Sequence, residues 1–184
     1  GAWCRMPTTL LGMVDASVGI KVAINYHRKN GVGHFFSPTH TFVDNSFLPT
    51  VSKADIRSGV GEIMKAALVH DRRLFDLMEQ HGEKLIDANF CGKASEEEGE
   101  GAEQEPQDDD DSSSNSVAAV ADTVIKFSVD TMLQCIGPDL WEESLLRPMD
   151  FGHSFSRTLE ADNSFKLRHG EAVAIDCIMS TMVA

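Results

Sequence analysis

The chain has 184 residues, of which 42% are hydrophobic, and a formal net charge of −13 at pH 7. This length suits one domain or slightly more and is sufficient for a buried core. We expect neither a membrane nor a nucleic-acid partner, because no apolar run approaches the roughly 18 residues of a membrane span and no basic cluster occurs.

The negative charge is concentrated in one segment. Residues 96–111 hold ten acidic residues and no basic residue, and a run of serines follows. Such a composition buries too little apolar surface to offset the entropy lost on ordering. We therefore predict a disordered acidic insert at residues 93–116, with a polymer-binding role as the alternative.

The four cysteines lie far apart in the sequence, at Cys4, Cys91, Cys135 and Cys177. No C-x-x-C pair occurs, so the pattern favours neither a disulfide framework nor a cysteine zinc site. A reducing compartment is expected, either the cytoplasm or a plastid. The chain begins in mid-pattern at Gly1 without a signal peptide, and we expect it to be a fragment of a longer protein.

The first 51 residues are rich in glycine, threonine and β-branched residues. A short strand is predicted at residues 40–44, and a strand followed by a turn at residues 6–19. Residues 15–33 place charged side chains among glycines, which suits a loop that approaches a polyhydroxylated or phosphorylated ligand. A polar surface hairpin is the alternative, and no G-x-G-x-x-G fingerprint of dinucleotide binding occurs there.

A helix is predicted to begin after Ser52, which serves as its N-cap with Asp55 at the third position. Apolar residues then recur at helical spacing, at Ile56, Val60, Ile63 and Ala67. Gly59 and Gly61 each cost this helix about 1 kcal/mol relative to alanine. Close packing or a close ligand would explain why glycine occurs there.

Three further helices are predicted from apolar periodicity, over residues 72–87, over residues 117–133 and from residue 169 to the end. The predicted fold class is therefore α/β plus α. Residues 1–51 are expected to be the end of an N-terminal nucleotide-binding α/β domain. Residues 52–184 are expected to form a mostly helical metal-binding domain.

Glu62 and Lys65 are three residues apart, so they share one face of the first predicted helix. Considered alone, Glu62 and Lys65 would be an ion pair exposed to solvent. Considered alone, His153 would be a polar residue of a loop and His169 a polar residue at the start of a helix, without a metal. Together, one glutamate and two histidines form a common catalytic zinc set with an open position for water or substrate. The residues alone leave both alternatives open.

Five motifs follow one another in an order that resembles the sugar phosphate cyclase family: PTTLLGMVDASVGIK, KN, GVGEIMK, DFGHSFS and RHGEAVAID. That family includes 3-dehydroquinate synthase and the 2-epi-5-epi-valiolone and demethyl-4-deoxygadusol synthases. The resemblance covers nearly the whole chain outside the acidic insert. It implies that the chain holds the metal domain and only the rim of the NAD domain, so we expect it to be inactive alone and to bind NAD weakly.

The resemblance implies a role for each matched residue. The zinc ligands, with Co²⁺ as an alternative metal, would be Glu62, His153 and His169. The catalytic residues, which would act on or bind the substrate, would be Asp15, Lys21, Asn30, Lys65, Glu142 and Asp150, with Glu142 matching a family acid near the metal. Contacts to NAD would come from Thr8, Thr9, Lys29 and Thr50.

The implied reaction is a cyclisation. Bound NAD would transiently oxidise a substrate hydroxyl while Zn²⁺ polarises its oxygen. Phosphate would then be eliminated, hydride would return, and an intramolecular aldol step would close a carbocycle. The expected partner is a small sugar phosphate, and the enzyme is expected to be an NAD- and zinc-dependent lyase that forms a homodimer.

Departures from the 3-dehydroquinate synthase pattern concern the substrate. That branch usually has asparagine at the position of Asp150, histidine at the position of Arg157, and a lysine near Leu133. The aspartate within RPMDFGHSFS resembles the synthases that use sedoheptulose 7-phosphate, which lacks a carboxylate. Valiolone-type synthases usually have proline at the position of Arg157 and arginine at the position of Leu146, so this chain differs from them as well.

The expected function is therefore conversion of sedoheptulose 7-phosphate to a C7 cyclitol, either 2-epi-5-epi-valiolone or demethyl-4-deoxygadusol. One alternative is 3-dehydroquinate synthase itself. The others are a truncated, non-catalytic relative and a metal-dependent polyol dehydrogenase, which would accumulate NADH where a cyclase returns its hydride.

Overall fold

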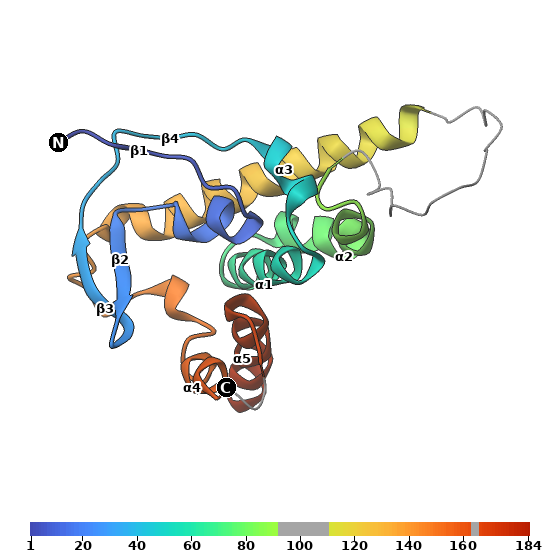
Figure 1. The fold of residues 1–184 in the computed structure, drawn as a ribbon. Helices are drawn as coiled ribbons and strands as arrows, with labels where there is room; N and C mark the ends of the chain where they lie inside the picture. Colours follow the sequence, from blue (N-terminus) through green and yellow to red (C-terminus); the bar gives the residue numbers. More distant parts are fainter. Residues whose placement is uncertain (92–110, 163–165) are drawn as a thin grey trace.

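The structure, a computed structural model, describes residues 1–91, 111–162 and 166–184 (Figure 1). The strands within these ranges are β1 (Cys4–Arg5), β2 (Lys21–Tyr26), β3 (Arg28–Phe35) and β4 (His40–Thr41). The α-helices are α1 (Lys53–Val69), α2 (Arg72–Asp87), α3 (Asp111–Ile136), α4 (Ser156–Ala161) and α5 (His169–Val183). A short α/β part thus precedes a mostly helical part, which confirms the predicted fold class. None of the helices described is long and apolar enough to cross a membrane.

Two small sheets form the N-terminal part. β1 pairs with β4 in parallel, and β2 pairs with β3 as an antiparallel hairpin in which Lys21 lies opposite Phe35. The long helix α3 crosses the molecule with α1 and α2 packed against it, and the hairpin lies near its C-terminal end (Figure 1). A ring contact between Phe35 and Trp141, with centroids 5.7 Å apart, joins the hairpin to the loop that follows α3.

The strand predicted within residues 6–19 is wrong. The chain is helical there and forms a π-helix at Gly12–Ala16, and the Thr9 hydroxyl accepts a hydrogen bond from the Gly12 N–H at 3.1 Å. Leu10, Met13 and Val14 are all buried. Spacings of three and four residues bring these side chains to one side of a helix, whereas a strand would have exposed some of them.

Helix α1 begins as the sequence predicts. The Ser52 hydroxyl accepts a hydrogen bond from the Asp55 N–H, and Ile56, Ile63 and Ala67 are buried in the core. The Asp55 carboxylate also pairs with Arg168, the residue before α5. The N-terminal cap of α1 therefore helps to hold α5 in place.

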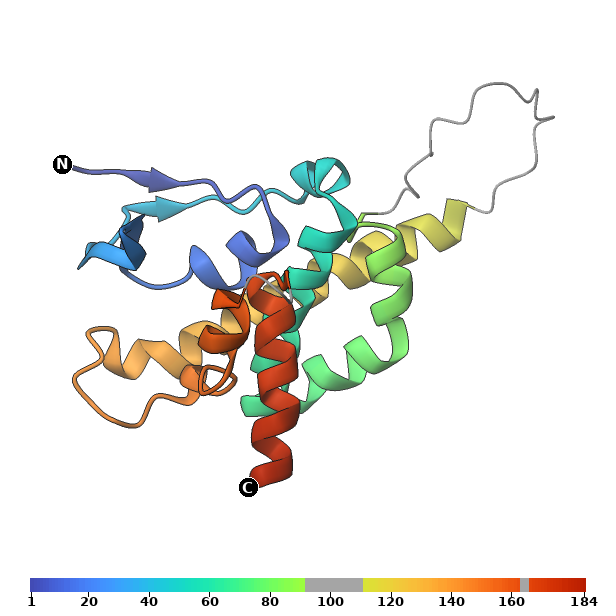
Figure 2. The same ribbon diagram turned by 60° about the horizontal axis from the view of Figure 1, so that its bottom comes forward.

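The two glycines of α1 serve close packing, one of the two reasons expected for them. A Cβ at Gly59 would lie 2.6 Å from Leu10 Cγ, and a Cβ at Gly61 would lie 2.1 Å from the backbone oxygen of Gly170. A Cβ at Gly170 would in turn lie 1.7 Å from the backbone oxygen of Ser58. The first turn of α5 thus lies directly against the backbone of α1 (Figure 2).

Helix α3 begins at Asp111 and ends at Ile136, so the predicted bounds of 117–133 are too narrow. The sequence at the start of α3 consists of an aspartate and serines, residue types that occur at helix N-termini as well as in solvated loops. Composition alone predicts residues 111–116 as part of the acidic insert, whereas the structure places them in α3. Of the predicted insert, residues 93–110 lie outside the described residues.

Helix α2 matches its predicted range and is capped by Asp71. The Asp71 carboxylate accepts hydrogen bonds from the Arg73 N–H at 2.9 Å and from the Arg73 guanidinium at 2.8 and 3.1 Å. The hydroxyl of Thr131, on α3, lies 3.4 Å away. Replacing Asp71 with alanine should lower the free energy of unfolding by about 1–2 kcal/mol, because the cap and its contact with α3 are lost.

The stability lost in Asp71→Ala should depend on pH, because the Asp71 carboxylate must be ionised to make these contacts. Hydrogen bonds from Arg73 lower the pKa of Asp71 to about 2. Because an unfolded aspartate has a pKa near ~3.9, the stabilisation is complete above about pH 4 and is lost as the pH falls toward 2. Urea unfolding at pH 7 and pH 2.5 should show the cost of Asp71→Ala shrinking at low pH. An equal cost for Asp76→Ala, which removes an exposed Arg72 pair, would contradict this role.

Candidate active site and metal centre

Glu62, His153 and His169 meet at one place. Each offers a ligand atom, and these atoms all lie within 4.8 Å of one another. Glu62 projects from α1, His169 is the first residue of α5, and His153 lies in the loop before α4. The close approach of α5 to α1 brings Glu62 and His169 together, because each is next to a glycine of that contact.

The loop that carries His153 is held by Asp176 on α5. This carboxylate is completely buried, and one of its oxygens accepts hydrogen bonds from the Phe155 and Ser156 N–H groups at 2.5 and 2.7 Å. Gly152, at φ +77°, allows the chain to turn into this loop, and a Cβ there would lie 2.7 Å from Cys177 Sγ. The loop is therefore built on the helix that begins with His169.

Each histidine has a partner on its Nδ1 atom. His169 Nδ1 lies 3.0 Å from a Glu160 carboxylate oxygen, and His153 Nδ1 lies 3.3 Å from the backbone oxygen of Phe151. Such partners fix the tautomer with the proton on Nδ1, which leaves Nε2 with a lone pair for a metal. His169 Nε2 is the atom on the Glu62 side, 3.3 Å from its carboxylate.

The charge states also suit a metal cation. Both carboxylate oxygens of Glu62 are buried without a hydrogen bond of good geometry, although Lys65 Nζ lies 2.5 Å from one of them. Burial raises the pKa of Glu62, but His169 and Lys65 outweigh it and lower the pKa to about 2. Burial, and then the Lys65 cation, lower the pKa of His153. An ionised carboxylate and a neutral imidazole are the forms that bind Zn²⁺, so these residues fit the metal.

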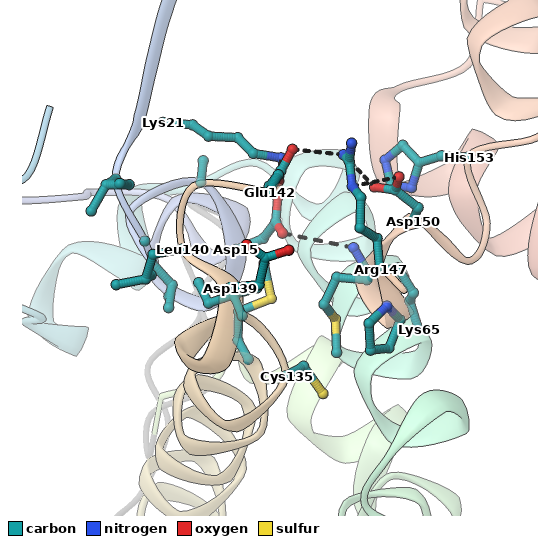
Figure 3. Close-up of a pocket in the computed structure, with 18 of the residues that line it drawn as sticks. Asp15, Lys21, Lys65, Cys135, Asp139, Leu140, Glu142, Arg147, Asp150 and His153 are labelled. Carbon is teal, nitrogen blue, oxygen red and sulfur yellow. Dashed lines mark hydrogen bonds and ion pairs between the residues drawn. The ribbon is translucent and has the colours of Figure 1, made fainter. Parts of the chain in front are cut away.

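A cavity of about 690 Å³ opens beside this cluster (Figure 3). It is lined by every residue for which substrate contact is predicted, namely Asp15, Lys21, Asn30, Lys65, Glu142 and Asp150. His153 and His169 lie in the same wall. The structure therefore brings two of the predicted metal ligands and the predicted substrate residues to one cavity, with Glu62 buried behind Lys65.

Ion pairs connect the charged side chains of the cavity (Figure 3). Glu142 pairs with Lys21 and, at 2.8 Å, with Arg147. Arg147 also pairs with Asp150 at 3.0 Å. These contacts connect the hairpin to the loop after α3, so a ligand bound in the cavity would contact both.

Lys65 is the buried cation of the site. It is 2% exposed, and its Nζ lies 2.5 Å from Glu62 and 3.7 Å from Asp15. Burial lowers the pKa of Lys65, but the two carboxylates outweigh it and raise the pKa. Burial, followed by the nearby Glu62 charge, raises the pKa of Asp15. Lys65 is therefore a permanent positive charge, whereas Asp15 is prepared to hold a proton.

Arg5 supports the turn between the π-helix, which carries Asp15, and β2, which begins at Lys21. Its guanidinium donates hydrogen bonds to the backbone oxygens of Ser17, Gly19 and Lys21 at 2.9, 2.7 and 3.1 Å. Sequence reasoning missed this residue, because nothing in the local pattern shows that one arginine reaches three carbonyl groups.

Of the predicted NAD contacts, Thr8, Thr9 and Thr50 are not among the described residues that line the cavity. The Thr9 hydroxyl accepts a hydrogen bond from the Gly12 N–H, and the Thr50 hydroxyl donates to the Phe47 backbone oxygen at 2.7 Å. Thr8 is exposed, and the side chain of Lys29 lies outside the described part of the structure. The role of these four residues stays a prediction.

Two supporting acids were also missed, Glu160 and Asp176. Each follows a histidine of the cluster by seven residues, and for Asp176 this spacing is two turns along α5 from His169. An acid at that offset from a candidate ligand is the one sequence signal that points to such partners. Without the histidine assignments, neither acid stands out.

Replacing Asp176 with asparagine should weaken the site without removing a ligand. An amide keeps one acceptor oxygen but loses the negative charge that holds two backbone N–H groups and the Ser180 hydroxyl, at 2.8 Å. We expect a loss of about 1–2 kcal/mol in stability and roughly 10-fold in zinc affinity. Zinc competition titrations and urea unfolding would measure both, with the exposed residue Asp130→Asn as the control. Unchanged zinc affinity would rule out this positioning role.

Comparison with known proteins gives consistent matches. The family model described as 3-dehydroquinate synthase C-terminal matches residues 59–184, and the model described as 3-dehydroquinate synthase N-terminal matches residues 2–58. The two matches meet inside α1. The domain boundary predicted at residues 51 and 52 stays a prediction.

Two similar proteins carry synthase names. A 2-epi-5-epi-valiolone synthase from Actinomyces sp is 40% identical over 99% of this chain and 43% of its own length. A demethyl-4-deoxygadusol synthase from Trichormus variabilis is 32% identical over 99% of this chain and 40% of its own length. The chain thus spans less than half the length of the curated relatives that it matches.

A solved structure is also similar. It is a 2-epi-5-epi-valiolone synthase from Streptomyces hygroscopicus subsp. jinggangensis 5008 with NAD+ and Zn2+ bound. The TM-score is 0.78 at 37% sequence identity, and the match covers 97% of this chain and 43% of that chain.

Proposed function

The chain belongs to the 3-dehydroquinate synthase family, and we propose that it forms the metal and substrate part of a cyclising lyase that acts on sedoheptulose 7-phosphate. The product would be a C7 cyclitol, either 2-epi-5-epi-valiolone or demethyl-4-deoxygadusol. Because the chain spans less than half of its relatives, the complete reaction is proposed for a protein of the relatives' length.

The observation that carries this proposal is the cluster of Glu62, His153 and His169 at the edge of a charged cavity. When bound, Zn²⁺ would supply a Lewis acid for a substrate oxygen, and NAD would supply a transient hydride acceptor. Thr8, Thr9, Lys29 and Thr50 are retained as the proposed NAD contacts. The solved relative with both cofactors supports this pairing.

The chain's own residues would bind and orient the substrate. Lys65, fixed by two carboxylates, places a positive charge where a substrate oxygen gains negative charge. Asp15, whose pKa burial raises, would exchange a proton with a substrate hydroxyl. Lys21 and Asn30 border the cavity on the hairpin side and would orient further hydroxyl groups.

The wall contributed by α3 favours a substrate without a carboxylate. Met132, Cys135 and Ile136 line the cavity there, and no lysine or arginine of α3 is among the lining residues described. A carboxylate buried against such a wall would lack a cationic partner, which is costly. Sedoheptulose 7-phosphate has no carboxylate, whereas the precursor of 3-dehydroquinate has one.

The test is phosphate release by the full-length protein supplied with NAD+ and Zn²⁺. We expect release from sedoheptulose 7-phosphate, none from the 3-dehydroquinate precursor, and no net NADH. Preference for the precursor would make the protein a 3-dehydroquinate synthase, and NADH accumulation would make it a dehydrogenase. If the folded, zinc-loaded protein releases phosphate from neither substrate, the protein is a non-catalytic relative.

A further inference from the structure

The residue that precedes α5 cannot cap this helix with its own side chain. That residue is Arg168, whose guanidinium has only donor groups and cannot accept a hydrogen bond. The first N–H groups of a helix have no partner within the helix, and one of them normally binds the side-chain oxygen of the residue at this position. The acceptor for the first turn of α5 must therefore come from elsewhere in the chain.

Ser58, on α1, supplies this acceptor. Its hydroxyl oxygen accepts a hydrogen bond from the Gly170 N–H at 3.0 Å, and both residues are buried. Gly170 is the second residue of α5, a position whose N–H group an N-terminal cap normally binds. The Arg168 N–H donates to a Glu171 carboxylate oxygen at 2.9 Å, as in a local capping box. The first turn of α5 thus combines this local contact with a cap from a residue 112 positions away.

This cap lies directly beside two of the proposed metal ligands. Ser58 precedes Glu62 by four residues on α1, so the two side chains share one face of that helix. Gly170 follows His169, and the Glu62 carboxylate lies 3.3 Å from His169 Nε2. A shift of α5 along this face of α1 would therefore change the distance between the two ligands. A hydrogen bond is directional and opposes such a shift, whereas glycine packing only permits the helices to approach.

A second contact joins the same segments, but it is exposed. Asp55 pairs with Arg168, and their side chains are 42% and 45% exposed. Exposed ion pairs contribute little and are screened by salt. Ser58 is only 5% exposed, and removing its hydroxyl would leave the buried Gly170 N–H without this acceptor, which is costly. The buried hydrogen bond therefore outweighs the ion pair in placing α5.

We propose that Ser58 is a positioning residue of the metal centre, which caps α5 and thereby holds His169 where it binds the same metal ion as Glu62. This inference rests on the proposed function, because it concerns the same metal centre. Ser58 is not among the described residues that line the cavity, so it acts through His169 and not on the substrate. Without the cap, some chains have a frayed first turn of α5, and the apparent zinc affinity falls in proportion to the intact fraction.

The test combines zinc competition titrations with hydrogen exchange of the Gly170 amide, measured by NMR on the 184-residue chain. Ser58→Ala should weaken zinc binding roughly 10-fold and speed Gly170 exchange in the metal-free chain by a similar factor. Saturating zinc should slow this exchange again, because the bound metal holds His169 and with it the first turn. Ser58→Thr keeps the hydroxyl and should recover most of the zinc affinity.

Two further variants serve as controls. Ser128, on α3, is 1% exposed, and its hydroxyl donates to the Val124 backbone oxygen of its own helix at 2.7 Å. Ser128→Ala also removes a buried hydroxyl, but it should leave zinc affinity and Gly170 exchange unchanged. Asp55→Asn removes the charge of the exposed ion pair and should weaken zinc binding by only about 2-fold.

The outcomes separate this inference from the proposed function. Equal zinc affinity in wild type and Ser58→Ala would overturn the role of Ser58 and leave the metal centre in place. The same conclusion would follow if Ser128→Ala or Asp55→Asn lost as much affinity as Ser58→Ala. If the wild type binds no zinc, the metal centre and the role of Ser58 fail together.

Discussion

Replacing Gly170 with alanine is expected to destabilise the chain by about 3 kcal/mol or more and to dismantle the metal centre. The new Cβ would lie 1.7 Å from the backbone oxygen of Ser58. Because that atom belongs to the backbone of α1, no side-chain rotation can relieve the overlap, and α5 must move away. Since His169 precedes Gly170 and Glu62 lies on α1, this movement separates two of the proposed ligands.

Urea unfolding and zinc titration of the same preparations would measure both effects. The matched control is Gly82→Ala, at a buried glycine of α2 where the added Cβ would meet only Met78 Cε, at 3.5 Å. That substitution should be neutral or stabilise the helix by up to about 1 kcal/mol. A Gly170→Ala chain as stable as the Gly82→Ala chain would show that α5 does not lie against α1 as described.

Replacing Lys65 with methionine should cost about 3–5 kcal/mol of stability in the absence of metal. The substitution keeps a long apolar side chain but removes the ammonium that lies between Glu62 and Asp15. The buried Glu62 carboxylate and the partly buried Asp15 carboxyl group would then lie close together without a cation. Zinc bound to Glu62 would compensate part of this repulsion, so zinc should stabilise the variant more than it stabilises the wild type.

The measurement is urea unfolding at pH 7 with a chelator and then with saturating Zn²⁺. Lys126→Met, at an exposed position of α3, serves as the control and should change stability by less than about 0.5 kcal/mol. A loss for Lys65→Met no larger than that of the control would mean that the buried ion pairs do not hold the site together.

The helices were predictable because their signals are local. Ser52 and Asp55 form the cap that begins α1, and α2 and α5 begin and end close to their predicted bounds. The sequence does not show why α1 contains glycines. In the structure Gly61 lies against the backbone of Gly170, more than a hundred positions away. A single sequence contains no information on which segment lies against such a glycine.

The errors also have physical reasons. Residues 6–19 contain β-branched and threonine residues that suggested a strand, but burying Leu10, Met13 and Val14 against the helices requires helical spacing. The start of α3 was assigned to the acidic insert, because composition alone does not separate a solvated loop from an acidic helix N-terminus.

The residues of the candidate site that lie in ordered family motifs were predictable. The residues that hold these motifs in place from distant parts of the sequence were not. The sequence predicts Glu62, His153 and His169 as metal ligands, and the structure places their ligand atoms within 4.8 Å of one another. Arg5 and Asp176 were not predicted, because their role is to bind backbone groups of loops that they meet only in the folded chain.

The most direct test of a shared metal centre is a zinc titration of the 184-residue chain beside its Glu62→Gln and His153→Ala variants. We predict one zinc ion per wild-type chain. Each variant should lose more affinity than the roughly 10- to 100-fold that removal of a supporting partner costs. Zinc binding with the same stoichiometry and affinity in all three proteins would contradict the metal centre, and with it the cyclase function proposed for this chain.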